Sequence, residues 1–299
     1  MSFSANVKTE LCRQPLGKRQ TAVAEAHGVL LYCNTFSASL IRIVTENEAF
    51  AARLPRLFRK AFGLDFDLVP DAAAAGKQVF QITGQEKLTL IFHAFGFSPS
   101  TGVTLHVNYG LLEEDADRLA FLRGAFLAGG SVTDPEKRYH LELICPHVKA
   151  FRETDALLLD MDFQPKGLMR NGSGVLYFKQ SDSIEDFLTS VGAPVCAMQI
   201  MEAKVEKDLR NGVNRRVNCE TANLTKVVDA SVEQIAAIRK LQQAGILEQQ
   251  NEKLRQTAQL RLDNPEATLS ELAQMPDPPV SKSAMNHRMR KLIGLASEL

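Results

Sequence analysis

The first 205 residues combine hydrophobic patterns of helical period with patterns of strand period. Helical spacing predicts helices over residues 19–34, 47–62, 114–129 and 148–161. Short apolar or alternating runs predict strands over residues 36–45, 78–83, 87–93, 139–145, 174–180 and 195–203, and Asn171-Gly172 predicts a hairpin turn. The order helix, strands, helix, strands occurs twice with a period of about 95 residues, so we expect a duplicated α+β domain at 1–205.

After this domain the pattern is purely helical. Residues 206–230 form a polar, basic connector with RNGVNRRVN at its centre. Residues 231–299 predict a small all-α domain, with helices over 232–244, 248–262, 268–275 and 282–296. A chain of 299 residues suits two domains at about 150 residues each.

The last two helices, residues 268–296, are predicted to form a helix-turn-helix unit. Thr268 and Glu271 have the spacing of a capping box, which begins a short helix. The prolines of Met275-Pro-Asp-Pro-Pro279 end that helix, and Ser281 can cap the next one. The turn is longer than in the tight form of the motif, so we expect a variant helix-turn-helix.

The final helix has two different faces. Helical spacing places its apolar residues on one face: Met285, Met289, Leu292, Ile293 and Ala296. The opposite face carries side chains of the types that read bases in a major groove: Ser283, Asn286, His287 and Arg290. Phosphate contacts are expected from the flanking residues Ser281, Lys282, Arg288 and Lys291. The alternative is an ordinary solvated surface helix, which the absence of acids on this face disfavours.

Composition narrows the function classes only slightly. Lys+Arg and Asp+Glu are equal at 35 each, so overall charge indicates no attraction to phosphate, and the cations of 281–291 matter by their clustering. No apolar run reaches about 18 residues, and charges come too early for a cleaved signal segment, so we expect neither membrane spanning nor secretion. Five cysteines without a CxxC pair favour a reducing cytosol over a disulfide framework or a zinc site.

The helix of the second repeat resembles a known signature. Phe121-Leu-Arg-Gly-Ala-Phe-Leu-Ala-Gly-Gly-Ser-Val132 is similar to the LAGLIDADG motif of homing endonucleases, and residues 26–36 fit it more weakly, with Gly28 in place of Gly124. The resemblance implies two central helices beneath a saddle of antiparallel sheets, related by an internal pseudo-two-fold axis. Glycines at these positions would let the two helix backbones approach closely.

The same resemblance argues against nuclease chemistry. In that family an acid at the end of each signature helix binds the divalent metal that activates water, which requires oxygen ligands. The matching positions here are Cys33 and Gly129, neither of which supplies a carboxylate. We therefore expect no enzyme, no catalytic residues, no metal and no cofactor, in a scaffold that binds DNA without cutting it.

Four stretches resemble the WhiA regulators of Gram-positive bacteria: SFSANVKTEL, RLAFLRGAFLAGGSVTDPEKRYHLEL, NRRVNCETANLTK and LRLDNPEATLSELAQMPDPPVSKSAMNHRMRKLIGLA. This resemblance implies a cytoplasmic, nucleoid-associated transcription factor for promoter DNA, linked to sporulation, cell division and chromosome segregation. It implies a monomer, with another transcription factor or RNA polymerase as a further partner. DNA contacts then fall on residues 281–291, and secondary DNA or interdomain contacts on Asn214, Arg215, Asn218, Asn223 and Lys226.

Two other function classes stay open on the sequence alone. The chain is a residual metal-dependent nuclease if acids outside the signature positions, such as Glu25 or Asp134, bind the catalytic metal. Alternatively, the N-terminal domain binds a protein partner and the helix-turn-helix only tethers it to promoters. Three smaller patterns are set aside: Cys145 and His147 near His140 lack zinc-ligand spacing, Cys33 and His27 point apart on a helix, and Asn171-Gly-Ser-Gly174 lacks phosphate-loop spacing.

Overall fold

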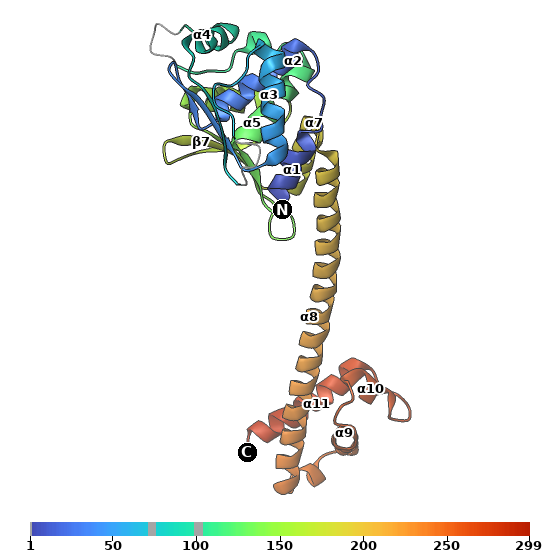
Figure 1. Cartoon of the computed structure of the whole chain (residues 1–299). Coiled ribbons are helices and arrows are strands. Elements are labelled where there is room, and N and C mark those ends of the chain that lie inside the picture. The colour runs from blue at the N-terminus through green and yellow to red at the C-terminus, as the bar shows by residue number, and fades with distance from the viewer. Residues whose placement is uncertain (1, 71–75, 99–103) are drawn as a thin grey trace. The chain divides into compact units, whose positions relative to one another are not determined.

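Two helices that bury mostly apolar residues, α2 (Arg19–Tyr32) and α5 (Asp115–Gly129), form the centre of the first half of the chain (Figure 1). In this computed structural model, which describes residues 2–70, 76–98 and 104–299, every residue of α2 from Ala24 onward is buried. A helix that is apolar on all sides belongs inside a core. The two helices therefore pack against each other and are covered by the remaining elements.

Glycine brings these two backbones into direct contact. A Cβ atom on Gly28 would lie 2.0 Å from the carbonyl oxygen of Phe121, and one on Gly124 would lie 2.1 Å from that of Glu25. Real Cβ atoms essentially never come within 3.0 Å of such a neighbour. The predicted close approach at Gly28 and Gly124 is confirmed.

A three-stranded antiparallel sheet belongs to the first repeat, in the order β1 (Thr35–Phe36), β2 (Ile41–Thr45), β3 (Gln78–Ile82). Ile41, Ile43 and Thr45 face the core, while Arg42 and Val44 face outward. The accompanying helices are α3 (Glu48–Phe62) and α4 (Gln85–Ala94), and α1 (Phe3–Leu11) precedes the repeat.

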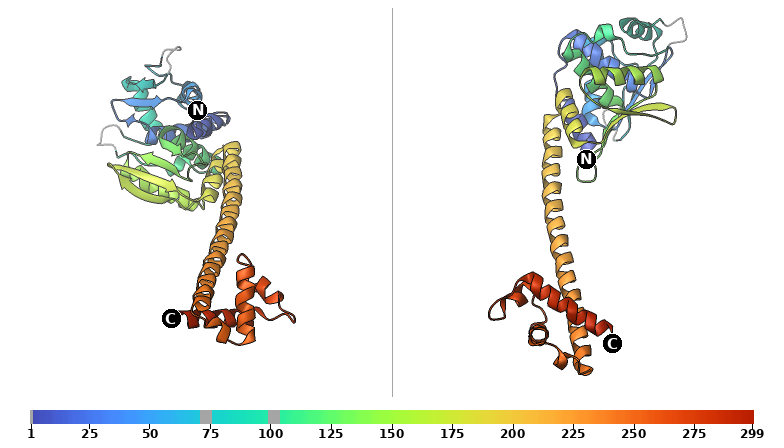
Figure 2. Two further views of the ribbon diagram at one scale, coloured as in Figure 1. Left: turned by 90° about the horizontal axis from the view of Figure 1, so that it is seen from below. Right: turned by 180° about the vertical axis from the view of Figure 1, so that it is seen from behind.

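The second repeat has a four-stranded antiparallel sheet in the order β4 (Gly130–Val132), β5 (Leu141–Cys145), β7 (Ser173–Phe178), β6 (Lys166–Arg170). Figure 2 (left) shows this sheet in yellow-green, separate from the blue strands of the first repeat. The predicted hairpin turn is confirmed, since Asn171 (φ 51°) and Gly172 (φ 80°) join β6 to β7. Helices α6 (Val148–Asp160) and α7 (Ser181–Val191) complete the repeat, and the duplicated α+β class is confirmed.

The chain divides into two compact units, Met1–Lys207 and Asp208–Leu299. Helix α8 (Pro194–Gln243) begins in the first unit and continues into the second, which also holds α9 (Glu252–Asp263), α10 (Leu269–Gln274) and α11 (Lys282–Ser297). Short 3₁₀ turns occur at Tyr109–Leu111 and Leu247–Gln249. The second unit has its own apolar core, built from Ile238, Leu241, Leu254, Ala258, Leu272 and the buried face of α11.

Two predicted strands are wrong. Residues 87–93 belong to α4, because Leu88, Ile91 and Phe92 are buried at helical spacing while Leu90 is exposed. Residues 195–203 belong to α8, where the buried residues are again helically spaced: Cys196, Ala197, Ile200 and Ala203. In both segments the apolar residues alternate along the sequence as in a strand, because some of them lie on the exposed face of the helix.

Other differences concern boundaries. The predicted strand 36–45 is a hairpin of β1 and β2, in which the Ser37 hydroxyl bonds with the backbone of Leu40 at the turn. Strand β6 was not predicted, because all five of its residues are exposed and carry no alternating pattern. The connector 206–230 is helical throughout, as part of α8. The boundaries at 205 and 230 stay predictions.

Candidate nucleic-acid interface

Helix α10 starts with the predicted capping box. The Thr268 hydroxyl accepts a hydrogen bond from the Glu271 backbone N–H at 3.3 Å, and the Glu271 carboxylate accepts one from the Thr268 N–H at 2.7 Å. The Thr268 backbone bond, with a smaller contribution from its hydroxyl, lowers the pKa of Glu271. The capping box is therefore confirmed, and it fixes where the first helix of the motif begins.

Hydrogen bonds fix both ends of α11 and the loop before α10. Val280 N–H donates to the carbonyl of Ala273 at 2.9 Å, which ties the end of the turn back to α10. The buried Arg261 guanidinium donates to the carbonyls of Asn264 and Ala267, at 3.3 and 2.6 Å, and so organises the loop before α10. At the other end of α11, the Lys240 ammonium donates to the carbonyl of Ala296, where a cation favours the helix dipole.

Helix α11 buries the face that its sequence predicts. Met285, Met289, Leu292 and Ala296 are 0 to 5% exposed and contact α9 and α10, while Ile293 is half-buried. Ser281 caps the helix by accepting from the Ala284 N–H at 3.1 Å. The helix is therefore fixed in its rotation about its own axis, and its remaining face is determined.

That remaining face consists of the predicted base-reading and phosphate-binding residues. Ser281, Lys282, Ser283, His287, Arg290 and Lys291 are exposed, and Asn286 and Arg288 are half-buried. Apart from the cap made by Ser281, none of these side chains has a hydrogen-bond or ion-pair partner within the part of the chain that the structure describes. Residues 281–297 contain no acid. The face is thus cationic, and its polar groups are open to a ligand.

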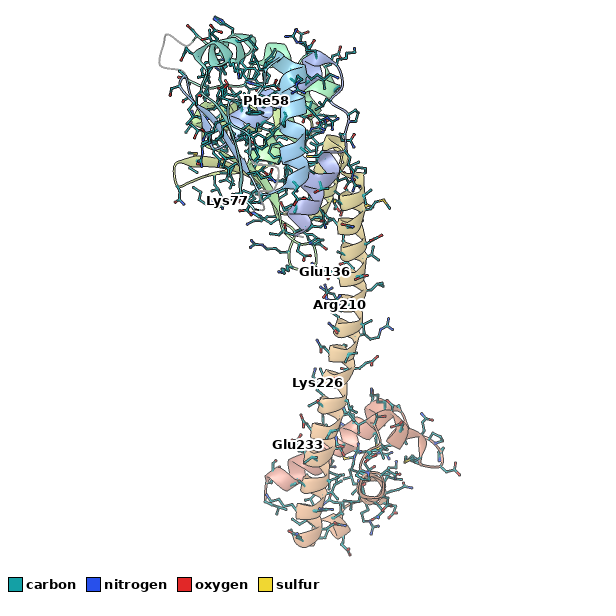
Figure 3. The ribbon with its side chains drawn as sticks, viewed as in Figure 1. Phe58, Lys77, Glu136, Arg210, Lys226 and Glu233 are labelled. Atoms are coloured by element: carbon teal, nitrogen blue, oxygen red, sulfur yellow. The ribbon has the colours of Figure 1, made fainter. Side chains whose placement is uncertain are left out.

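The five connector residues lie on the solvent-exposed middle of α8: Asn214, Arg215, Asn218, Asn223 and Lys226. Figure 3 shows the neighbouring Arg210, as well as Lys226, projecting from this helix. The cations alternate along the helix with Asp208, Glu220 and Asp229. Because such acids repel phosphate, this stretch is a weaker candidate for DNA contact than α11.

The two positions that match the signature acids carry no carboxylate. The buried Cys33 thiol donates to the carbonyls of Leu30 and Thr35 at 3.2 and 3.3 Å, and burial raises its pKa to about 12. A Cβ atom on Gly129 would lie 2.6 Å from the carbonyl oxygen of Ile144, so this position has no room for a carboxylate side chain. In residues 2–70, 76–98 and 104–299, no group of three or more His, Cys, Asp and Glu side chains is placed to hold a metal ion.

Glu25 and Asp134, the two acids considered for a residual nuclease, lie in different environments, one buried and one exposed. Both carboxylate oxygens of Glu25 bind the guanidinium of Arg53, at 2.6 and 2.7 Å, and the pair is 1 and 3% exposed. Asp134 lies in an exposed turn, where it accepts from the backbone N–H of Glu136. Glu25 is therefore occupied by a structural ion pair and cannot serve as a metal ligand.

The histidines and cysteines set aside in the sequence also have packing roles. His27 is buried against the rings of Phe95 and Phe121, and its Nε2 accepts from the Asn108 N–H at 3.2 Å. Burial lowers the pKa of His27 to about 3, so the ring is neutral. The Cys145 thiol donates to the carbonyl of His147 at 3.4 Å. All five cysteines are free thiols.

Comparison with known proteins covers both units. A family model for the WhiA C-terminal HTH domain matches residues 213–296, and a model for the WhiA LAGLIDADG-like domain matches residues 118–210. The probable cell division protein WhiA of Ruminiclostridium cellulolyticum is 38% identical over 307 residues, which cover all of this chain and 98% of that protein. The chain belongs to the WhiA family. A second WhiA relative, the probable cell division protein of Clostridium novyi, is 34% identical over 312 residues, with coverage of 100% and 98%.

The WhiA fold is shared as well. A crystal structure of full-length WhiA from Thermatoga maritima has a TM-score of 0.60 at 24% identity, covering all of this chain and 99% of that one. The resemblance to the WhiA family, the LAGLIDADG-like first domain and the helix-turn-helix are thus confirmed. Within the described residues, no helix of this WhiA chain is long and apolar enough to cross a membrane.

Proposed function

We propose that this chain is a sequence-specific DNA-binding regulator of transcription that acts on promoter DNA. One observation carries the proposal: α11 is fixed by its buried face and presents an acid-free row of unpartnered polar and cationic side chains. This is the arrangement by which the second helix of a helix-turn-helix enters a major groove. The names of the relatives, probable cell division proteins, support a role in cell division. Chromosome segregation and sporulation belong to the same proposal.

We further propose a division of labour along α11. Ser283, Asn286, His287 and Arg290 read base edges, since Asn pairs with adenine and Arg with guanine through two hydrogen bonds each. Ser281, Lys282, Arg288 and Lys291 contact phosphates, which fix the register of the helix on the duplex. Secondary contacts, with DNA or between the domains, are made by five residues of α8: Asn214, Arg215, Asn218, Asn223 and Lys226.

The first unit is proposed to have no enzymatic role. Cys33 and Gly129 replace the metal-binding acids of the signature, and Glu25 is engaged with Arg53. We infer a cytoplasmic, nucleoid-associated monomer that requires no metal or cofactor. Its first unit is available for a protein partner, such as another transcription factor or RNA polymerase.

Arg290→Ala is expected to lose discrimination at one base pair. Losing a bidentate contact to guanine costs about 1–3 kcal/mol of specificity, roughly 5- to 150-fold in relative affinity. Competition binding between the preferred site and all single-base variants measures it. Equal weakening on every sequence would contradict a base-reading role for Arg290.

Lys282→Ala is expected to weaken all DNA sequences alike. Loss of one phosphate contact reduces the slope of log affinity against log salt by about 0.9. The matched control is Lys253→Ala, which removes an exposed lysine from α9 and should leave both affinity and slope unchanged. A change in base preference with Lys282→Ala would contradict the assignment.

A further inference from the structure

A pocket of about 880 Å³ opens on the first unit, beside Cys33 and Gly129, the positions that match the acids of the signature. Its floor is formed by Leu127 and Ala128, near the end of α5, and by Asn34, just after α2. One wall is the outward face of β2, with Arg42 and Val44. The end of each signature helix therefore contributes to a pocket instead of a metal centre.

Helix α1 forms the opposite wall of this pocket through Ser4, Ala5, Lys8 and Thr9. The helix is held in place from two sides. The Asn47 side-chain amide donates to the Ala5 carbonyl and the Thr9 hydroxyl, at 3.1 and 3.2 Å, and the Ser4 hydroxyl accepts from the Val132 N–H at 3.4 Å. This wall is therefore hydrogen-bonded to both repeats.

Three cations line the pocket: Lys8, Arg42 and Lys77, the last directly before β3 (Figure 3). None of them has an ion-pair partner among the residues that the structure describes. Two exposed acids, Glu46 and Glu48, also lie on the lining. Among the residues that the structure describes, the lining thus holds three cations and two acids.

Lys8 is the most constrained of these cations. Burial lowers the pKa of its ammonium group to about 8, because the charged form loses water, and the nearby Cys12 thiol offsets this only in part. An anion bound beside Lys8 would supply the missing counter-charge.

We propose that this pocket binds a small organic phosphate of nucleotide size. Arg42, Lys77 and Lys8 would hold the phosphate, and Val44, Leu127 and Ala128 would contact the uncharged part. The volume is within the range of about 300–1,000 Å³ typical of small-molecule sites, and it exceeds what inorganic phosphate needs.

The test is isothermal titration calorimetry of the full chain with the mono- and diphosphates of the four common ribonucleosides, and with pyrophosphate. We expect at least one nucleotide to bind with a dissociation constant below about 1 mM, and the matching nucleoside without phosphate to bind at least about tenfold more weakly. Arg42→Gln and Lys77→Gln should each weaken binding about tenfold. Lys166→Gln, on the exposed edge strand of the second sheet, is the matched control and should leave binding unchanged.

Two outcomes would overturn the proposal. In one, none of these compounds binds below about 1 mM, or binding is insensitive to Arg42→Gln and Lys77→Gln while circular dichroism shows both variants folded. In the other, a promoter duplex at saturating concentration displaces the bound nucleotide from the wild-type chain but not from Arg42→Gln or Lys77→Gln. The duplex would then bind the same cations, and the pocket would be part of a DNA surface. Neither outcome bears on α11, so the proposed regulator function is tested separately.

Discussion

Gly124→Ala is expected to abolish the stable fold of the first unit. The added Cβ atom would lie 2.1 Å from the carbonyl oxygen of Glu25 and 2.9 Å from the backbone nitrogen of Val29. Backbone atoms cannot move aside as a flexible side chain can, so α2 and α5 must separate and open the core around them. We expect a loss of unfolding free energy greater than the roughly 1–3 kcal/mol that overpacked core positions usually cost, because the added atom meets backbone atoms that cannot repack.

Hydrogen exchange of peptides from α2 and α5 measures this effect, because it reports on the first unit separately from the second. The matched control is Gly212→Ala on α8, where a Cβ atom meets nothing within 4 Å. There, the higher helix propensity of alanine should stabilise the helix by up to about 1 kcal/mol. Protection of α2 and α5 in Gly124→Ala within about 1 kcal/mol of wild type would contradict the close-approach account.

Glu25→Leu is expected to have the second largest effect. Glu25 is the only acid that binds the buried Arg53 in the described part of the chain, and its Oε2 also lies 3.5 Å from Arg123. The Arg53 guanidinium additionally donates to the carbonyls of Cys12 and Gln14, at 3.1 and 2.6 Å, so it cannot turn outward without losing these bonds. Leaving a buried charge without its partner costs about 3–5 kcal/mol.

The double variant Glu25→Leu, Arg53→Met separates charge from packing. Replacing both members of a buried ion pair by apolar groups of similar size is often close to neutral. We therefore expect the double variant to recover most of the stability that Glu25→Leu loses, as measured by denaturant unfolding of the full chain. A double variant no more stable than Glu25→Leu would show that packing and the Arg53 bonds to the Cys12 and Gln14 carbonyls, not the unpaired charge, determine the cost.

Local patterns predicted the elements whose burial follows one regular period. The capping box at Thr268 and Glu271, the hairpin turn at Asn171 and the buried face of α11 depend on residues within about one helical turn or one tight turn of each other. The strand at 87–93 was wrong because Leu90 is apolar and exposed, so its letter adds to an alternation that burial does not follow. Residue type alone does not show which apolar side chains the tertiary structure leaves exposed to solvent.

The candidate site was predictable to a similar extent. The seven candidate residues of α11 and its cap Ser281 follow from spacing and residue type, and the structure leaves six of the eight exposed and Asn286 and Arg288 half-buried. Contacts between distant segments were not predictable. The partnership of Glu25 with Arg53, and the pocket between α1 and β2, each bring together residues more than 25 positions apart, for which a single sequence carries no pairing signal.

The most direct test of the proposed function is selective DNA binding by α11. Full-length protein and the double variant Asn286→Ala, Arg290→Ala are titrated against a set of genomic DNA fragments at two salt concentrations, with magnesium present and the gels examined for cleavage. We expect the wild-type chain to select a subset of fragments without cutting them, and the variant to keep salt-dependent binding but lose the selection. Unchanged selection by the variant would move recognition away from α11, and magnesium-dependent cleavage by the wild-type chain would contradict a regulator without nuclease activity.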